Sequence, residues 1–239
     1  MRSAAIVLVR PRLPANLGAV ARVAKNFGVL PLRLVEPAAA ADEEAARLAS
    51  GADDVLETLT RHEKLTEAVA DCEIVIATSS LRGRGQIRPL QLAELPGYLS
   101  RSAPGRIAFV FGPERSGLTE EERSHASTSL RLPTRPEFPT MNLSHAVAVV
   151  LAVAAAFPGE DPGAAEKESL APASEIEATV GHWDRALEAI GFYDTGHRER
   201  SLREWRRLIA GRPLSEREVA MLRGVANRVL VSLRRRDPG

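Results

Sequence analysis

The sequence lacks the residues and motifs on which several common protein chemistries depend. It contains one cysteine, Cys72, in 239 residues. A single thiol excludes an internal disulfide and a zinc site built from several cysteines, and we expect it to be buried and reduced. No Ser-His-Asp pattern, metal-ligand spacing or carboxylate pair stands out, and neither a P-loop nor a GxGxxG fingerprint is present. Nucleoside triphosphates, NAD and metal ions therefore lose support as ligands.

Long apolar runs are also scarce. The longest, Met141–Phe157, has 17 residues and begins with polar side chains, whereas a helix needs about 20 apolar residues to span a bilayer. It is therefore expected to be a core or interface helix. The apolar run Met1–Val9 is short and leads into Arg10 without a small-residue cleavage site, so it predicts a strand rather than a signal peptide. We expect a cytoplasmic protein that does not bind membranes.

The composition suits an ordinary soluble globular protein. Hydrophobic residues make up 44% and charged residues 26% of the chain, and the formal net charge is +1. The charges are unevenly distributed: residues 1–157 carry 18 basic and 17 acidic side chains, residues 158–194 carry 2 and 9, and residues 195–239 carry 12 and 5. A basic C-terminal segment is a candidate surface for nucleic acid, and solvated arginine-rich helices are the alternative.

Short apolar runs alternate with helical patterns up to about residue 157. The expected strands are Ala4–Val9, Pro31–Val35, Glu73–Ala77, Arg106–Phe111 and Ser127–Leu132, and the expected helices are Asn16–Phe27, Ala41–Ser50, Glu63–Ala70, Leu90–Leu99 with a break at Pro96, a helix opened by the capping box Thr119–Glu122, and Met141–Phe157. This alternation predicts an α/β domain with a mostly parallel sheet buried on both faces. Ligands of such sheets bind beyond the carboxyl ends of the strands, so the loops after Ala77, Phe111 and Leu132 form the expected site.

The expected domain boundary lies in residues 158–173, which contain Pro, Gly, Ala and acidic residues without apolar periodicity, as linkers do. Residues 1–157 form the expected main domain, and residues 174–239 a small basic helical domain. Its helices are predicted at Glu175–Ile190, at Ser201–Ile209 and from Ser215 to about Arg235. A module of roughly 65 residues has a small core, so we expect it to depend on the main domain or on a partner.

Polar side chains near the expected site admit simple structural explanations. The loop Gly112–Gly117 could be a tight turn, or its glycines could let the backbone approach a ligand while Glu114 accepts hydrogen bonds. Asn16 is placed to cap the first helix, and either Thr140 or Asn142 to cap the long apolar helix. For His145, packing at an interface is favoured over catalysis.

Three stretches taken together resemble the SPOUT superfamily of knotted methyltransferases, in its TrmH-like 2′-O-ribose branch. They run from Asn16 to Arg22, from Phe109 to Leu118 and from Met141 to Ala148, in the order and spacing of that family's three motifs. Two further stretches, Leu187–Phe192 and Met221–Val225, resemble the helical C-terminal extension of TrmJ-type tRNA methyltransferases. The resemblance implies a mostly parallel α/β sheet with a deep trefoil knot, flanked by helices and followed by a small helical domain.

The resemblance also implies that S-adenosylmethionine binds in the knot, held mainly by backbone groups of the strand-end loops. Carried over to this sequence, the cofactor contacts fall on Thr78, Ser79, Ser80, Gly112, Leu132, Pro139, Thr140 and Met141. The residues expected to contact RNA are Arg82, Arg84 and Arg88, which match the family's basic loop, and Arg115. No metal ion is expected.

The family assigns activation of the ribose hydroxyl to an arginine that corresponds to Arg22. A guanidinium with a pKa above about 12 is a poor base, so Arg22 is expected to stabilise the developing alkoxide and to grip the adjacent phosphate. Thr140 and Asn142 would assist it, while Asn16 and Glu114 would shape the pocket. Many relatives have serine where this chain has Thr140, and threonine's extra methyl restricts how the hydroxyl points.

By the same resemblance, the protein is expected to be a homodimer whose sites draw on both subunits, with Asn142–Phe157 as an interface helix. The expected activity is S-adenosylmethionine-dependent 2′-O-ribose methylation of tRNA at nucleotide 32 of the anticodon loop. Methylation of ribosomal RNA, or RNA binding without catalysis on the same fold, are the alternatives. The basic C-terminal domain is expected to grip tRNA phosphates.

Overall fold

The computed structural model describes residues 4–79, 88–101, 105–156, 169–193 and 197–236. Its centre is a seven-stranded sheet in the order β3-β2-β1-β6-β4-β7-β5, and all recorded strand pairings are parallel. The strands are β1 (Ala4–Val9), β2 (Leu32–Val35), β3 (Thr60–His62), β4 (Ile74–Ser79), β5 (Leu90–Gln91), β6 (Ile107–Phe111) and β7 (Thr128–Arg131). The parallel sheet expected from the alternating pattern is thereby confirmed.

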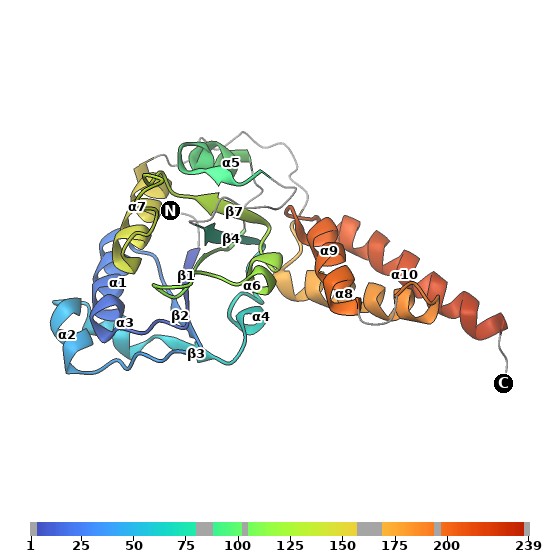
Figure 1. The fold of residues 1–239 in the computed structure, drawn as a ribbon, viewed down its shortest axis with the longest axis horizontal. Helices are drawn as coiled ribbons and strands as arrows, with labels where there is room; N and C mark the ends of the chain where they lie inside the picture. The colour runs from blue at the N-terminus through green and yellow to red at the C-terminus, as the bar shows by residue number, and fades with distance from the viewer. Residues whose placement is uncertain (1–3, 80–87, 102–104, 157–168, 194–196, 237–239) are drawn as a thin grey trace.

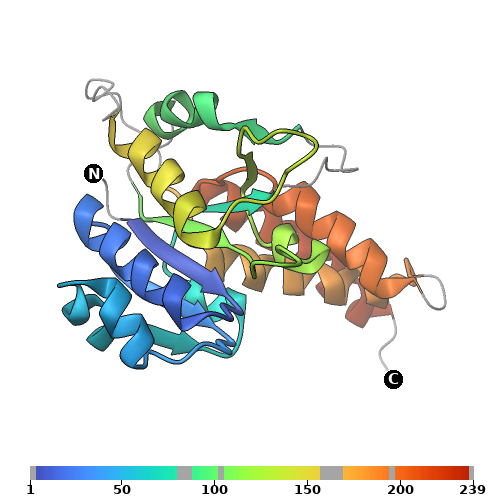
Figure 2. The ribbon, with the colours of Figure 1, turned by 60° about the vertical axis from the view of Figure 1, so that its left-hand side comes forward.

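Helices cover both faces of this sheet (Figure 1). They are α1 (Pro14–Phe27), α2 (Glu43–Ala49), α3 (Asp53–Glu57), α4 (Leu65–Ala68), the 3-10 turn η1 (Leu92–Glu94), α5 (Leu95–Arg101), α6 (Glu120–Ser124), α7 (Leu143–Ala156), α8 (Ala173–Ala189), α9 (Arg198–Ala210) and α10 (Glu216–Arg236). On one face, α1 packs against α2, α3 and α7, and Figure 2 shows α7 alongside α1. On the other face, α4 contacts α8, and α6 contacts α9.

Successive side chains of a strand point to opposite faces, so each central strand contributes to two cores. In β1, Ile6 and Leu8 join a cluster that includes side chains of α1 and α7. Val7 and Val9 join a second cluster with side chains of α4 and with Ala173 at the start of α8. All six residues of β1 are buried, as expected for a parallel strand covered on both sides.

The helices α8, α9 and α10 form a C-terminal module that extends away from the sheet (Figure 1). Its own core contains Ile176, Val180 and Ile209. The rings of Trp183 and Trp205 stack on one another with their centroids 5.4 Å apart. This core is small, and the first residues of α8 pack on the main domain instead.

Three details differ from the expected elements. Leu90–Leu99 is not one helix broken at Pro96, because Leu90 and Gln91 pair with β7 as an edge strand. Pro96 is the second residue of α5, where it is tolerated because N–H groups of a helix's first turn lack intrahelical acceptors. The structure also contains α3 and β3, which the sequence did not predict. Each has five residues or fewer and carries no apolar periodicity.

The single cysteine is buried and free, as expected. Burial raises the pKa of the Cys72 thiol to about 12, so the thiol stays protonated and unreactive at neutral pH. In the described part of the chain, no helix combines the length and the apolar character that crossing a membrane requires.

Candidate active site

The carboxyl ends of β6, β4 and β7 lie side by side, because these strands are neighbours in the sheet. Ala77 is in register with Val110, and Thr78 with Leu130. The hydroxyl of Thr78 donates to the backbone oxygen of Val110 at 3.0 Å, which ties the end of β4 to that of β6. The three loops predicted to form the site therefore leave the same edge of the sheet.

The loop after β6 folds back on itself at Gly112. A Cβ at this position would lie 2.4 Å from the backbone carbon of Gly117 and the backbone nitrogen of Leu118. Gly117 has a φ of +64° and donates its N–H to the oxygen of Pro113 at 2.9 Å. Of the two explanations offered for this loop, the tight turn is confirmed, and the turn fixes the position of Glu114.

A chain of hydrogen bonds joins side chains from all three motif stretches. Asn16 Nδ2 donates to Glu114 Oε1 at 2.8 Å, and Asn142 Nδ2 donates to Asn16 Oδ1 at 2.9 Å. We refer to Asn16, Glu114 and Asn142 as the polar cluster. Its outer members are supplied by the loop after β6 and by the segment before α7, so the cluster lies where the strand-end loops meet α1.

Asn16 does not cap α1, contrary to the sequence-based expectation. The N-cap residue is Leu13, and no side chain bonds to the first amides of this helix. Asn16 is 6% exposed and points to Glu114 instead. The helical spacing from Asn16 to the buried Val20 is a signal that could have revealed its burial, because residues four apart share a helix face.

Asn142 is the cap of α7, and Thr140 is not. Asn142 Oδ1 accepts from the backbone N–H groups of Ser144 at 2.9 Å and of His145 at 3.4 Å. It also accepts from the Ser144 hydroxyl at 2.8 Å. The same amide therefore caps the helix and belongs to the polar cluster, so the start of α7 is fixed relative to α1.

One oxygen of the polar cluster has no partner. Glu114 Oε2 is buried and makes no hydrogen bond within the described residues. An unpartnered buried carboxylate oxygen carries a desolvation cost. This atom is therefore a place where a bound ligand could add a favourable interaction.

Arg22 lies apart from the polar cluster. An α-helix turns about 100° per residue, so Arg22, six positions after Asn16, points about 120° away from it. Its side chain is exposed, and no hydrogen bond or ion pair is recorded for it among the described residues. The structure of one chain therefore brings together Asn16, Glu114 and Asn142 but not Arg22.

The segment between β7 and α7 is held by bonds within itself. The Thr134 hydroxyl donates to the Pro139 oxygen at 3.1 Å, and the Phe138 N–H donates to the Arg135 oxygen at 3.1 Å. Phe138 is nevertheless 78% exposed, and Thr140 is also exposed. The segment's predicted cofactor contacts are buried Leu132, exposed Pro139 and Thr140, and half-buried Met141.

The residues predicted to contact RNA are only partly visible. Arg82 and Arg84 lie outside the described residues, as does Ser80, which was predicted to contact the cofactor. Arg88 forms an ion pair with Glu94 at 2.9 Å, and Arg115 is exposed on the loop that carries Glu114. Across the described ranges, three or more metal-ligating side chains do not gather at any point.

Two family models match the chain. One, described as the SpoU rRNA methylase family, matches residues 3–152. The chain belongs to this family. It is therefore an RNA methyltransferase. The second model, described as the C-terminal domain of the tRNA methyltransferase TrmJ, matches residues 174–238.

Individual relatives and solved structures resemble the chain over between 64% and 95% of its length. The tRNA (cytidine/uridine-2′-O-)-methyltransferase TrmJ of Cronobacter sakazakii is 32% identical over 228 residues, covering 92% of this chain and 93% of the relative. The crystal structure of TrmJ from Z. mobilis matches with a TM-score of 0.83 and 34% identity, covering 95% of this chain and 98% of that one. A structure that concerns 2-OH methylation of C/U34 on tRNA has a TM-score of 0.51 and 28% identity, covering 64% and 94%. The expected resemblance and the SPOUT-type fold class are confirmed.

Proposed function

We propose that this RNA methyltransferase uses S-adenosylmethionine to methylate the 2′-hydroxyl of nucleotide 32 in the anticodon loop of tRNA, in the cytoplasm. The observation that carries the proposal is the polar cluster. It joins the three motif stretches beside the strand ends, where ligands of parallel sheets bind. The similarity to relatives named for tRNA (cytidine/uridine-2′-O-) methylation supports the class of substrate.

The strand-end residues fit the proposed cofactor. Bound S-adenosylmethionine supplies a methyl group made electrophilic by a positively charged sulfonium. The unpartnered Glu114 Oε2 places negative charge beside the strand ends, which complements a cation. Backbone groups of Gly112 and of the segment from Leu132 to Met141 border the same edge of the sheet, and we propose that they hold the cofactor with Thr78 and Ser79.

Arg22 and Asn142 are proposed to act on the ribose. The hydroxyl must lose its proton as it attacks the methyl group, so its oxygen develops alkoxide character. A guanidinium that stays protonated can stabilise that negative charge and bind the adjacent phosphate. The Asn142 amide has two N–H groups, of which the bond to Asn16 uses one. Because Asn142 is exposed, its second N–H remains able to donate to the ribose oxygen. We propose that the hydroxyl of Thr140, two residues earlier, assists it.

A second copy of the chain is proposed to complete the site. The helix α7 consists of Ala, Val and Leu after its first turn, and a helix that is apolar on all sides is normally buried on all sides. In one chain, however, His145 and Ala152 of α7 are exposed. We propose that the partner subunit covers this face and that Arg22 of one subunit reaches the polar cluster of the other.

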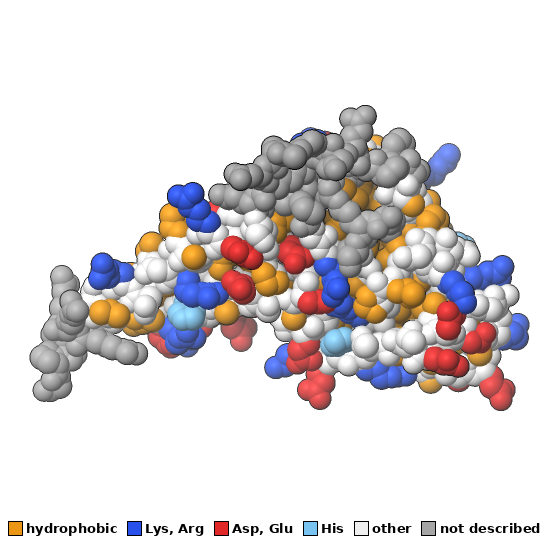
Figure 3. Space-filling model, turned by 180° about the vertical axis from the view of Figure 1, so that it is seen from behind, with side chains coloured by type: hydrophobic (Ala, Val, Ile, Leu, Met, Phe, Trp, Pro, Cys, Tyr) orange, Lys and Arg blue, Asp and Glu red, His pale blue; other side chains and the backbone are white. Residues whose placement is uncertain are grey.

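The C-terminal module is proposed to bind tRNA. Fewer of its arginines are available to bind phosphates than its composition suggests, because many form ion pairs. Most of its described arginines pair with acidic side chains: Arg198 with Asp184 and Glu188, Arg200 with Glu204, Arg203 and Arg206 with Glu121, Arg207 with Glu120, Arg212 with Glu218, and Arg223 with Glu175. Figure 3 accordingly shows acidic and basic side chains interspersed over one face. Arg217 and Arg228 on α10 have no ion pair among the described residues, and we propose that they meet tRNA phosphates.

The proposal is tested by incubating the protein with labelled S-adenosylmethionine and unmodified total RNA, then mapping ribose methylation by mass spectrometry. The expected product is tRNA methylated at nucleotide 32. Methylation at nucleotide 34 would correct the position, and methylation of ribosomal RNA alone would favour the alternative substrate. Failure to methylate any tRNA would overturn the proposal.

A further inference from the structure

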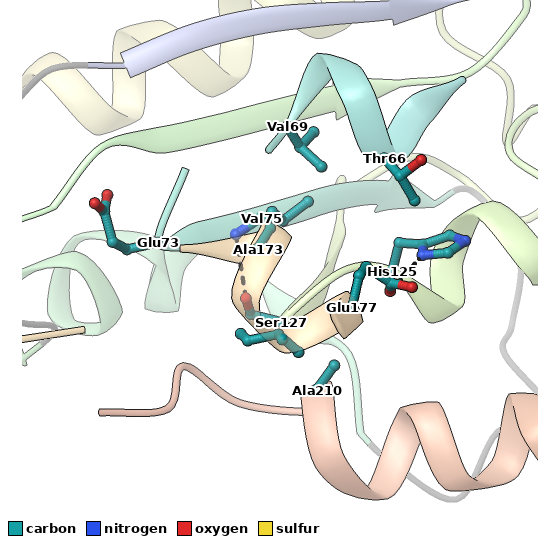
Figure 4. Close-up of a pocket in the computed structure, with 10 residues that line it drawn as sticks. Thr66, Val69, Glu73, Val75, His125, Ser127, Ala173, Glu177 and Ala210 are labelled. Atoms are coloured by element: carbon teal, nitrogen blue, oxygen red, sulfur yellow. Dashed lines mark hydrogen bonds and ion pairs between the residues drawn. The ribbon is translucent and has the colours of Figure 1, made fainter. Parts of the chain in front are cut away.

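The joint between the main domain and the C-terminal module is a partly buried network of polar and charged side chains with Arg206 at its centre. His125 Nδ1, directly after α6, lies 2.7 Å from Glu177 Oε1 of α8, and Figure 4 shows this pair facing one another. Arg206 NH1 of α9 lies 2.7 Å from Glu121 Oε1 of α6, and its Nε lies 3.2 Å from Glu177 Oε1. Arg206 is only 9% exposed. A charge buried this deeply requires its partners, so the network favours one position of α9 on α6.

The short helix α6 is held from two sides. Its three consecutive glutamates pair with different arginines: Glu120 with Arg207 at 2.6 Å, Glu121 with Arg206, and Glu122 with Arg10 at the end of β1. The hydrogen bond from Arg207 lowers the pKa of the Glu120 carboxyl. Burial opposes ionisation of Glu177, but the bond to His125 and the charge of Arg206 outweigh it and lower its pKa. The carboxyl groups of Glu120 and Glu177 are therefore charged at neutral pH.

The helix α6 is continuous with the turn that carries Glu114. Leu118, between the turn and the helix, is 4% exposed and packs in the core. The guanidinium of Arg123 on α6 donates to the Leu118 backbone oxygen. Leu118 in turn packs so closely on Gly112 that the turn has no room for a Cβ. A displacement of α6 would therefore move the turn and the Glu114 side chain with it.

We propose that Arg206 and Arg207 are positioning residues for Glu114, and that docking of the C-terminal module on α6 holds the polar cluster in its catalytic geometry. The route runs from α9 through α6 and Leu118 to Glu114, and from Glu114 Oε1 to Asn16 at 2.8 Å. The inference rests on the proposed methyl transfer at the polar cluster. It gives the module a second role beside RNA binding, since it acts on the reaction geometry.

The test uses full-length Arg206→Gln and Arg207→Gln proteins, with Lys25→Gln as the control. Lys25 forms a surface ion pair with Asp54 at 2.7 Å, remote from the joint. For Arg206→Gln, kcat per cofactor-binding site should fall by about tenfold while KM for tRNA stays within about twofold, because an interaction that shapes the transition state is lost rather than substrate binding. The Arg207→Gln protein, which breaks a more exposed pair and is expected to fold, should show a smaller loss of kcat. Lys25→Gln should change neither constant.

A double-mutant cycle identifies the route. The combined effect of Glu121→Gln and Arg206→Gln on the activation free energy should be smaller than the sum of their separate effects, because both substitutions break the contact between Arg206 and Glu121. A rise in KM with unchanged kcat would make Arg206 an RNA contact and overturn the inference. An unchanged kcat per cofactor-binding site, with only fewer folded sites, would overturn it as well.

Calorimetry with S-adenosylmethionine alone separates this inference from the proposed function. If the wild-type protein methylates no tRNA, the proposed function fails while the positioning of Glu114 remains measurable. Weaker cofactor binding by Arg206→Gln, with Lys25→Gln unchanged, would then support the positioning role. Equal affinities in all three proteins would overturn it.

Discussion

The joint at α6 and the strand-end site differ in whether the charged side chains find partners within one chain. At the joint, buried Arg206 forms ion pairs with two carboxylates, although its Nε makes no hydrogen bond within the described residues. At the site, Glu114 Oε2 has no partner among the described residues, Arg22 is exposed, and Phe138 is 78% exposed. The buried charge of the joint is paired within one chain, whereas the site leaves charged and apolar groups for molecules outside the chain. This contrast supports placing the ligands and the second subunit at the strand ends.

The substitution expected to have the largest effect is Arg22→Ala, which removes a side chain that is exposed in the single chain. The kcat for tRNA methylation should fall by about 10²–10³-fold, as when a donor to a developing oxyanion is removed. The cofactor should still bind, because Arg22 is not among its proposed contacts. Steady-state kinetics and calorimetry measure the two quantities. Arg61→Ala, at an exposed arginine of β3, is the matched control and should leave both unchanged.

Gly112→Ala tests how closely the turn at the site is packed. Because the added Cβ would lie 2.4 Å from backbone atoms, the free energy of unfolding should fall by about 3 kcal/mol. Gly224 on α10 has nothing within 4 Å of an added Cβ. Gly224→Ala should therefore raise stability by about 0.5–1 kcal/mol through helix propensity. Urea denaturation of both variants makes the comparison, and equal stabilities would show that the turn is adaptable.

Glu177→Gln tests the charge pairing of the joint through its pH dependence. The lowered pKa of Glu177 means that its ionised form contributes stability above its unfolded pKa, near about 4.3, and loses it as the pH falls through the folded pKa. At pH 7 the variant should be less stable than wild type by about 1–2 kcal/mol, and the gap should close on acidification below about pH 4.

The matched control for that measurement is Glu199→Gln, at an exposed residue of α9. It should differ little from wild type throughout the pH range. If the difference in stability between Glu177→Gln and the wild type did not change with pH, packing rather than charge would hold the joint.

The sheet and the place of the site were predictable because both depend on local patterns. Apolar runs fixed the strands, and parallel strands bring their loops to one edge. The partner of Asn16 was not predictable from the residues alone, because Glu114 is 98 positions away and helix capping explained Asn16 equally well. The joint was missed for a similar reason. Residues 158–194 and 195–239 carry opposite net charges, but only the tertiary fold shows that Glu177 and Arg206 pair with one another.

The central claim, that Arg22 serves the polar cluster of a second subunit, is tested most directly by mixing two inactive variants. Arg22→Ala and Glu114→Gln homodimers are denatured together in equal amounts, refolded, and assayed for tRNA methylation. Half of the dimers formed would be mixed, and each would hold one intact site, so the activity should return to about a quarter of wild type. If Arg22 serves its own chain, every site in the mixed dimers is defective. Activity that stays at the level of the two parent variants would contradict the account.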